Sequence, residues 1–401
     1  MSAVSVGKSE KVRLQLLFAL FGMGLMCFSP RLPDLKANLG VNNGTFGTLL
    51  SLGVIGSMVS LLTMGQLVHK FGVKQTLFVS STAMYLLIAS VPHVHSPMLY
   101  VVFNICIGAS FSAYNIAIHT QILHRQEESG EILLPRAHGA WSIGVLATAI
   151  LALFITDSVS FAVHVDTMIA IIWVITFSMI YSLRETFILK SEEPVTDIGI
   201  NLAKLKRTFT FDKSIIVFFI LAGMLEFSSN DWSTLVTYQE IGAAKSLSAL
   251  SYLALIFGMI LGRWNFDKLV FMRSERFWIR TAAIYGGIGF IVLTQSARMI
   301  ADTHLNLALA LEVLGFFVGG LGTSFMAPLA TNIANRRSSQ KPSEVVAQMN
   351  LTNGILAFFA KLIVSWVAQA TSITTALLIP GLMLVLASRF AYLGHPYRHR
   401  K

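Results

Sequence analysis

The sequence predicts an all-α integral membrane protein in which twelve transmembrane helices form two pseudo-symmetric six-helix bundles. The first observation is composition: apolar residues make up 54% of the chain and charged residues 12%, and the mean hydropathy is +0.68. A soluble domain carries about 25% charged residues, so this chain lacks the polar side chains to cover itself in water. The other two observations are a series of long apolar runs and a repeat between the two halves of the chain.

The same composition excludes a soluble enzyme, a disordered chain and a conventional nucleic-acid-binding protein, despite a formal net charge of +10. The chain has two cysteines, Cys27 and Cys106, and both lie inside apolar runs. Neither a disulfide scaffold nor a zinc cluster can be built from them. We therefore expect no metal and no cofactor.

The number of helices follows from the apolar runs, because a helix needs about 20 mostly apolar residues to cross the hydrocarbon core. Twelve runs qualify, and they cover residues 13–35, 44–68, 75–92, 97–123, 134–156, 166–183, 214–238, 246–263, 278–297, 304–330, 344–369 and 373–393. The runs are continuous rather than alternating, which favours helices over a β-barrel. Lys8, Lys11 and Arg13 resemble the start of a signal peptide, but no small-residue cleavage site follows, so the first helix is expected to be retained.

The orientation follows from the basic residues. If both termini are cytoplasmic, 25 of the 30 lysines and arginines lie in cytoplasmic segments, four lie outside and Lys361 lies within a span. This is a strong positive-inside bias. We expect a multi-pass protein of the plasma (inner) membrane with both termini in the cytoplasm, in contact with anionic lipid. The positive charge needs no nucleic acid to explain it, and we expect a monomer.

The domain organisation follows from the longest polar stretch, which separates six spans from six. The predicted parts are an N-terminal bundle, a central cytoplasmic loop, a C-terminal bundle and a cytoplasmic tail, at residues 1–183, 184–213, 214–393 and 394–401. Within the loop, residues 198–207 mix apolar and basic side chains. This pattern fits either a helix lying on the inner leaflet or an unstructured basic linker.

The two halves also repeat one another at an offset of 202 residues. Leu39-Gly40 precedes the second run, and Ile241-Gly242 precedes the eighth. Residues 65–74 and 267–276 share a Leu-Val pair and a basic end in corresponding loops. Duplicated six-helix halves with a binding cavity near the midplane are the architecture of secondary transporters.

Residues 65–74 resemble the loop 2–3 signature of the major facilitator superfamily, and the resemblance extends over the whole chain. The matching positions of this copy are Gly65, His69, Lys70, Gly72 and Lys74. A second copy matches at Gly262, Arg263 and Asp267. Residues 134–144 and 226–232 resemble a bacterial branch near the fucose permeases.

The resemblance implies a cytoplasmic gate. In the family, an acidic residue at the fifth signature position lies at a helix N-terminus and latches the two halves together. This chain has His69 there, so the first copy is expected to contribute less than the second, in which Arg263 and Asp267 are expected to form a charge pair. Lys70 and Lys74 are also explained by the positive-inside bias alone.

Ionisable groups inside a span are costly, and they usually face a cavity or a partner. The seventh run carries Glu226, Asn230, Asp231 and Trp232. Residues 226 and 230 share a helix face, and Trp232 can stack on an apolar or sugar-ring surface. Glu226 either exchanges a proton or makes one structural hydrogen bond between helices.

Two further charges lie within the tenth and eleventh runs. Glu312 and Lys361 either form a buried ion pair, or one of them contacts substrate or a proton. Asn353 adds an amide to the eleventh run, so it is a further candidate for binding a polar solute.

The fourth run carries Asn104, Asn115, His119 and Gln121. Asn115 and His119 are four residues apart on one face, which suits hydroxyl-rich or amide-bearing ligands, and histidine titrates near physiological pH. Packing with bonds to the backbone explains Asn104 and Gln121 equally well. Fucose-permease relatives carry an acidic group on this helix for proton coupling, and Asn115 takes its place here.

Charged residues also lie at the two ends of the bundle. Pro30 and Pro33 break the first helix, so Arg31 and Asp34 are expected at the outer mouth of the cavity, with ordinary interface charges as the alternative. Residues 136 and 138, an arginine and a histidine, are expected at the inner mouth.

These features predict a secondary active transporter that moves a small solute by alternating access, driven by a proton gradient, with a preference for a sugar or another polar solute. The chain has no Walker motif for ATP and no serine–histidine–aspartate arrangement, so we expect neither an ATP-driven pump nor an enzyme. A multidrug or metabolite exporter is the alternative, since the chain has 28 phenylalanines. A non-transporting membrane receptor is a further alternative.

Overall fold

The computed structural model describes residues 8–129, 133–183, 212–338 and 342–397, and every regular element in these ranges is a helix. Twelve helical segments in them are long and apolar enough to cross a membrane, from Glu10–Leu39 to Ile373–Leu393. Each overlaps the corresponding apolar run, so the predicted fold class and number of spans are confirmed. Residues 184–211, which include the predicted amphipathic segment 198–207, lie outside the described residues.

The first six spans are built from α1, α2, α3, α4, α5, α6 and α7. Their bounds are Lys8–Leu25, Leu32–Leu39, Asn43–Phe71, Val73–Ser90, Pro97–Ser129, Leu134–Ile155 and Phe161–Tyr181. The first span consists of α1 and α2 with a 3-10 turn, Ser29–Arg31, between them. Pro30 and Pro33 lie at this interruption, as the sequence predicts, because proline cannot donate the backbone bond that a continuous helix requires.

The second six spans are built from α9 to α16, and two of them are also interrupted. The helices are Lys213–Gln239, Ala249–Met272, Glu275–Ile300, Leu305–Thr323, Met326–Arg337, Pro342–Ala370, Ile373–Ala376 and Leu378–Ala387, ending in a 3-10 segment, Ser388–Leu393. The tenth span changes from α12 to α13 at Ser324 and Phe325. The last span consists of α15, α16 and the 3-10 segment.

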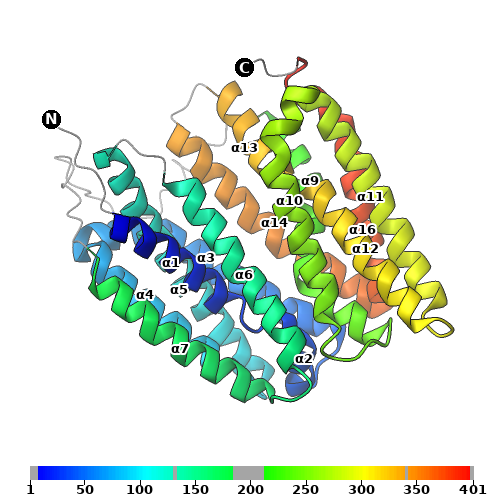
Figure 1. Ribbon diagram of the computed structural model, residues 1–401, viewed down its shortest axis with the longest axis horizontal. Coiled ribbons are helices and arrows are strands. Elements are labelled where there is room, and N and C mark those ends of the chain that lie inside the picture. The colour runs from blue at the N-terminus through cyan, green and yellow to red at the C-terminus, as the bar shows by residue number, and fades with distance from the viewer. Residues whose placement is uncertain (1–7, 130–132, 184–211, 339–341, 398–401) are drawn as a thin grey trace. The chain divides into compact units, whose positions relative to one another are not determined.

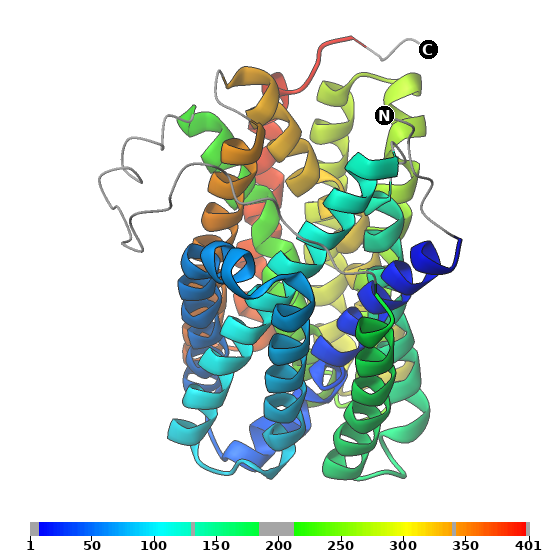
Figure 2. The ribbon, with the colours of Figure 1, turned by 90° about the vertical axis from the view of Figure 1, so that its left-hand side faces the viewer.

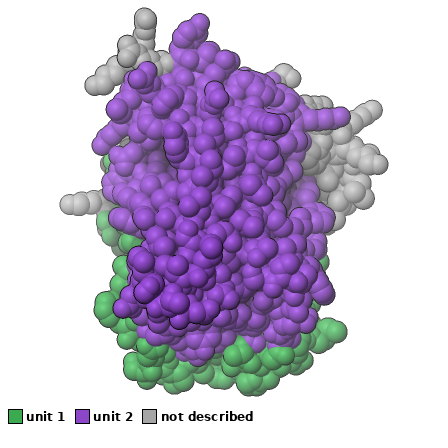
Figure 3. Space-filling model, turned by 90° about the vertical axis from the view of Figure 1, so that its right-hand side faces the viewer, with its two compact units in different colours: residues 1–29, 37–40, 52–200 green, residues 30–36, 41–51, 201–401 purple. Residues whose placement is uncertain are grey.

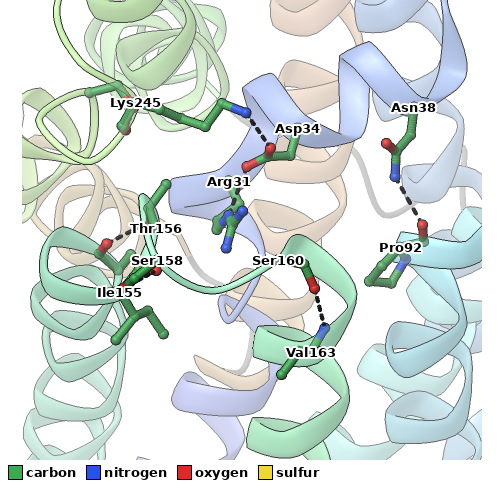
Figure 4. Close-up of polar contacts among 12 residues, drawn as sticks. Arg31, Asp34, Asn38, Pro92, Ile155, Thr156, Ser158, Ser160, Val163 and Lys245 are labelled. Atoms are coloured by element: carbon green, nitrogen blue, oxygen red, sulfur yellow. Dashed lines mark hydrogen bonds and ion pairs between the residues drawn. The ribbon is translucent and has the colours of Figure 1, made fainter.

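The chain folds into two compact units, which Figure 3 shows in different colours. Unit 1 contains residues 1–29, 37–40 and 52–200, and unit 2 contains residues 30–36, 41–51 and 201–401. In unit 1, α1 packs on α6 and α7, and α4 packs on α5 and α7 (Figure 1, Figure 2). The Ser160 hydroxyl caps α7 by accepting a bond from the Val163 N–H at 3.3 Å (Figure 4).

In unit 2, α11 packs on α12 and α16, and α10 packs on α12. The approach of α11 to α12 depends on two facing glycines, since a Cβ on Gly286 would lie 2.5 Å from the Cα of Gly322. Small residues of this kind allow membrane helices to pack closely, and they account for the glycines of the tenth span without a hinge. Glu275 begins α11, and its carboxylate receives Arg336 at 2.9 and 2.8 Å and the His395 N–H at 2.7 Å.

Residues 41–51 belong to unit 2 although the chain places them early. Their glycines allow this: a Cβ on Gly44 would meet the ring of Trp366 at 2.9 Å, and Gly47 lies against Ser365 and Trp232. The Trp366 indole N–H also donates to Thr48 Oγ1 at 3.2 Å. The division at residues 183 and 214 is a feature of the sequence, whereas this packing is a feature of the tertiary structure.

The internal repeat has a counterpart in the backbone. Gly40 and Gly242 have positive φ values of 61° and 79°, and they follow α2 and α9 respectively. They are the same two positions, 202 residues apart, at which the sequence repeats. Glycine adopts this conformation without the steric cost that a Cβ brings, so both halves end a corresponding helix in the same way.

The start of α9 yields a prediction about pH. The Ser214 N–H donates to the Asp212 carboxylate at 2.9 Å and Arg337 lies 3.3 Å from it, and these contacts lower the pKa of Asp212 below its usual value. A depressed carboxyl pKa stabilises the fold above the unfolded-state pKa, and this contribution is lost as the pH falls through the folded-state value. We expect Asp212→Ala to cost about 1 kcal/mol of unfolding free energy at pH 7 and less at pH 3. Unfolding of the two proteins at both pH values measures this, and an equal cost at both would contradict it.

Candidate functional site

The middle of unit 2 contains an ion pair between α9 and α14. Lys361 Nζ lies 2.9 Å from Oδ2 of Asp231 and donates to Oδ1 at 3.2 Å. Both groups lie within candidate membrane spans, and their side chains are 20% and 14% exposed. Of the two alternatives for Glu312 and Lys361, the ion pair between them is therefore wrong, because Asp231 is the partner of Lys361. A charge pair inside a membrane span that keeps partial exposure is the arrangement expected of a group facing a polar cavity.

Several polar residues lie close in sequence to Asp231 on α9, and one candidate lies on α14. Asn230 is half-buried, and so is Asn353 on α14. Trp232 is fully buried, and its ring lies against Gly47. Four buried hydroxyls of α9 have no hydrogen-bond partner in the described part of the chain, at Ser228, Ser229, Ser233 and Thr234. These hydroxyls were not among the predicted site residues, although the paired Ser-Ser and Ser-Thr steps beside Asp231 are visible in the sequence.

Glu226, five residues before Asp231 on α9, has a different partner. Arg263 of α10 donates Nη2 to both carboxylate oxygens of Glu226, at 3.1 and 3.2 Å, and donates Nε to the Ser324 carbonyl at 2.7 Å. The predicted pairing of Arg263 with Asp267 is therefore wrong. Arg263 instead links α9 to the break between α12 and α13. Sequence reasoning favoured the nearer acid, but residues four apart on a helix compete with groups that tertiary packing brings closer.

Glu312 is completely buried on α12, and neither of its carboxylate oxygens has a hydrogen-bond partner in the described part of the chain. An ionised carboxylate without a partner is very costly at such a site, so the buried group is expected to be neutral. Glu240 is a further acidic residue, directly after α9. Glu240 itself accepts the backbone N–H and the hydroxyl of Thr374 at the start of α15.

A second charged cluster lies where the first span is interrupted, and Figure 4 shows Asp34 between Arg31 and Lys245. Arg31 Nε lies 2.7 Å from Oδ2 of Asp34, and Lys245 Nζ lies 2.7 Å from Oδ1. Arg31 is 3% exposed and Asp34 is 11% exposed, whereas Lys245 is 37% exposed. The two residues that the sequence placed at the outer mouth are thus a bonded pair, and Lys245 is a third member that sequence reasoning missed.

Unit 1 brings together two histidines that lie 19 residues apart. His119 of α5 and His138 of α6 face each other with their Nε2 atoms 3.2 Å apart. Nδ1 of His119 lies 2.7 Å from the backbone carbonyl of Asn115, so these two residues are joined as their spacing suggested, but through the main chain. Phe18 of α1 contacts both imidazoles edge-on, at 5.2 and 5.7 Å between ring centroids. Asn104 is half-buried on α5 and packs against Gly53 of α3.

Comparison with models of protein families shows the family to which the chain belongs. The model of the Major Facilitator Superfamily matches residues 14–310, about three-quarters of the chain. This chain belongs to the major facilitator superfamily. It is a multi-pass membrane transporter, and the superfamily and the relatives below are transporters rather than enzymes.

Two curated relatives match almost the whole chain. An uncharacterized MFS-type transporter of Yersinia pestis is 23% identical over 400 residues, which are 97% of this chain and 97% of the relative. An uncharacterized transporter of Sinorhizobium fredii (strain NBRC 101917 / NGR234) is 20% identical over 377 residues, with 93% and 95% coverage.

Solved structures share the fold at lower identity. The nucleoside transporter NupG superposes with a TM-score of 0.74 at 15% identity, covering 96% of this chain and 98% of that one. A D-xylose-proton symporter superposes with a TM-score of 0.70 at 15% identity, with 95% and 96% coverage. At this level of identity the likeness shows the fold of the superfamily.

The structure describes part of the loop signature at residues 65–74. Gly72 has a φ of 84° between α3 and α4, so the tight turn expected there is present. Lys74 donates to the Tyr181 carbonyl at 2.8 Å, where a cation is favourable at the C-terminal end of α7, and Lys70 is exposed. The surroundings of Gly65 and the side chain of His69 lie outside the described part of the chain. In the second copy, Gly262 lies against Ser324, and Asp267 is exposed.

Because Arg263 pairs with Glu226 and not with Asp267, we expect Glu226 to matter more for transport than Asp267. We expect Glu226→Gln to lower transport at least about tenfold, because it removes the charge by which Arg263 of α10 is bound to α9. Asp267→Asn alters an exposed carboxylate and is expected to leave transport within about twofold. Exchange of solute across proteoliposomes compares the two variants. A larger loss for Asp267→Asn would restore the latch that the sequence predicted.

Proposed function

We propose that this protein moves a small polar solute, a sugar or a solute of similar polarity, across the membrane by alternating access in symport or antiport with protons. The observation that carries the proposal is the Asp231–Lys361 pair, at 2.9 Å, within two membrane spans of unit 2. Both charges keep partial exposure, and each offers bonds that a hydroxyl or amide group of a solute can make. A cavity built for apolar drugs has no need of such a pair.

The proton requires groups that can take it up within the spans. Glu312 is a buried carboxyl without a described partner, and Glu226 is held by Arg263. The imidazoles of His119 and His138 lie within spans of unit 1 with their Nε2 atoms 3.2 Å apart, and imidazole is a group that can take up a proton. The solved neighbours include a D-xylose-proton symporter and a nucleoside transporter by their own descriptions, which is consistent with this class of solute.

The topology and closer relationship belong to the same proposal. The distribution of lysine and arginine supports two cytoplasmic termini and an inner-membrane location, with bundles at 1–183 and 214–393. Residues 134–144 and 226–232 support a place near the fucose permeases. We propose a monomer, since each site described above is complete within one chain.

Counterflow in proteoliposomes tests this function. Radiolabelled D-xylose, L-fucose and uridine are offered outside vesicles loaded with the same unlabelled solute. Exchange of at least one of them, abolished by Lys361→Gln, is the expected result. Saturable binding without exchange would support a receptor instead. Exchange of an apolar cation such as ethidium, with none of the three polar solutes, would support the exporter. An imposed pH gradient then tests proton coupling. If the gradient leaves the accumulation of solute unchanged, the proposed coupling is wrong.

A further inference from the structure

Two apolar grooves lie on either side of α4 in unit 1. The first is formed by α3, α4 and α5, has a volume of about 380 Å³ and includes Phe71 in its lining. The second is formed by α4 and α7, has a volume of about 610 Å³ and includes Tyr181. Val79 and Ala83 of α4 line both grooves, so these two residues form a ridge between them.

The ridge is exposed to the surroundings of the protein. Val79 is 64% exposed, and Leu86, which lines the second groove, is 56% exposed. Both lie within the candidate span Val73–His93, so these apolar side chains face the acyl chains of the bilayer. Lipid tails are as apolar as the groove and gain no hydrophobic free energy by entering it. Any preference between lipids therefore depends on the groups that meet the headgroup.

A lysine lies beside an aromatic residue of each groove. Lys70 Nζ lies 5.4 Å from the centroid of the Phe71 ring, and Lys74 Nζ lies 5.4 Å from the centroid of the Tyr181 ring. Lys74 is the second residue of α4 and Tyr181 is the last residue of α7. The cation therefore lies where the two spans end, at the depth of lipid headgroups.

These cations are bound to neutral groups. Lys74 donates to the carbonyls of Tyr181 and Leu183 at 2.8 and 3.3 Å, and Arg13 of α1 donates to the carbonyl of the residue between them at 2.8 Å. Lys70 contacts the Phe71 ring. None of the three has an acidic partner in the described part of the chain. A phosphate group is a stronger acceptor for them than a carbonyl, because its charge assists the hydrogen bond.

We propose that the two grooves bind one anionic phospholipid, with an acyl chain on each side of the ridge at Val79 and Ala83 and its headgroup at Lys70 and Lys74. A zwitterionic lipid carries its own cation beside the phosphate, so it is attracted less by these lysines. The site concerns neither the solute nor the proton of the proposed function. It gives the two lysines of the first signature copy a ligand.

Native mass spectrometry of the full-length protein in detergent tests the site. Phosphatidylglycerol and phosphatidylcholine with the same acyl chains are titrated separately. The first phosphatidylglycerol is expected to bind at least about tenfold more tightly than phosphatidylcholine. Lys70→Gln combined with Lys74→Gln is expected to weaken phosphatidylglycerol binding at least about tenfold, because each lysine near the headgroups contributes about fivefold, and to change phosphatidylcholine binding less than about twofold.

Two matched controls accompany this test. Lys268→Gln alters an exposed lysine of the second signature copy and should change phosphatidylglycerol binding less than about twofold. Val79→Trp places a large ring between the grooves and should weaken binding at least about tenfold, whereas Val292→Trp, at a 53% exposed position of α11, should not.

Equal affinity for the two lipids, or a preference for phosphatidylglycerol that survives the double lysine variant, would overturn the site. If the double variant does not fold, Lys70→Gln alone decides. Lys70 is exposed and its described contact is with the Phe71 ring, so the fold does not depend on it. A loss of about fivefold supports the site, and no loss refutes it.

Trp173 of α7 reports where the lipid binds. Its indole N–H donates at 3.2 Å to Oγ1 of Thr82, which lines the second groove. Phosphatidylglycerol brominated near the middle of one chain, as a minor component of phosphatidylcholine nanodiscs, is expected to quench tryptophan fluorescence more than equally brominated phosphatidylcholine. This excess should disappear in Trp173→Phe. An excess that remains would place the anionic lipid elsewhere on the protein and refute the site.

Discussion

Replacing Lys361 by glutamine is expected to abolish solute exchange and to lower the unfolding free energy by an amount near the lower end of the range of about 3–5 kcal/mol. Asp231 would then be an ionised carboxylate within a membrane span without the ammonium that lies 2.9 Å away. The side chains of Lys361 and Asp231 are 20% and 14% exposed, so water screens part of the loss. Asp231→Asn is expected to destabilise by a similar amount, because it removes the partner of a lysine. Unfolding in detergent and counterflow in proteoliposomes measure the two effects.

The double variant Asp231→Asn with Lys361→Gln separates stability from function. Removing both charges is expected to restore the unfolding free energy to within about 1 kcal/mol, since replacement of a whole buried pair is often neutral. Transport should stay lost, because the solute then meets neither charge. Asp302→Asn is the control, since Arg298 and Asp302 lie 3.9 Å apart and are 43% and 91% exposed. Full transport by the double variant would show that the pair is structural.

Replacing Asp34 by asparagine is expected to cost about 3 kcal/mol of unfolding free energy, the second largest effect. One carboxylate serves two cations here, with Arg31 and Lys245 each at 2.7 Å. Arg31 is 3% exposed, so its guanidinium has little water to replace the lost charge. Unfolding of the variant in the same detergent gives the number.

The comparison with Lys245 makes this prediction specific. Lys245→Gln is expected to cost at most about 1 kcal/mol, because the lysine is 37% exposed and Asp34 keeps Arg31. The two losses should also depend differently on salt, since salt screens the exposed lysine more than the buried arginine. Equal losses for Asp34→Asn and Lys245→Gln would show that the buried side of the cluster contributes no more than its exposed side.

Much of the fold was predictable because it depends on properties that repeat along the chain. Hydrocarbon requires about 20 apolar residues per crossing, and each of the twelve runs became a candidate span. Pro30 and Pro33 marked the interruption of the first span, and Gly40 and Gly242 marked corresponding turns. Such signals are local, so a single sequence contains them.

The charged sites were predictable only as a set of residues. A charged residue inside a span needs a partner or a polar cavity, and this is why Asp231, Glu312 and Lys361 were predicted as binding or proton-coupling residues. The partner is chosen by helix packing: Lys361 pairs with Asp231 and not with Glu312, which was one of two alternatives, and Arg263 pairs with Glu226 and not with Asp267. Long side chains reach across a helix interface to any acid within a few ångströms, and sequence distance carries no information about that.

By itself, the sequence therefore determined that this protein lies in a membrane, how many times it crosses, that its halves repeat, and which charged residues lie inside spans at a cost in free energy. These follow from transfer free energies and from backbone stereochemistry, which act residue by residue. Only the tertiary structure decided that Asp231 holds Lys361, that Glu226 holds Arg263, that Asp34 is shared by two cations, and that His119 meets His138. Those choices depend on how helices far apart in the chain pack, because the free energy of an ion pair or hydrogen bond changes steeply over a few ångströms.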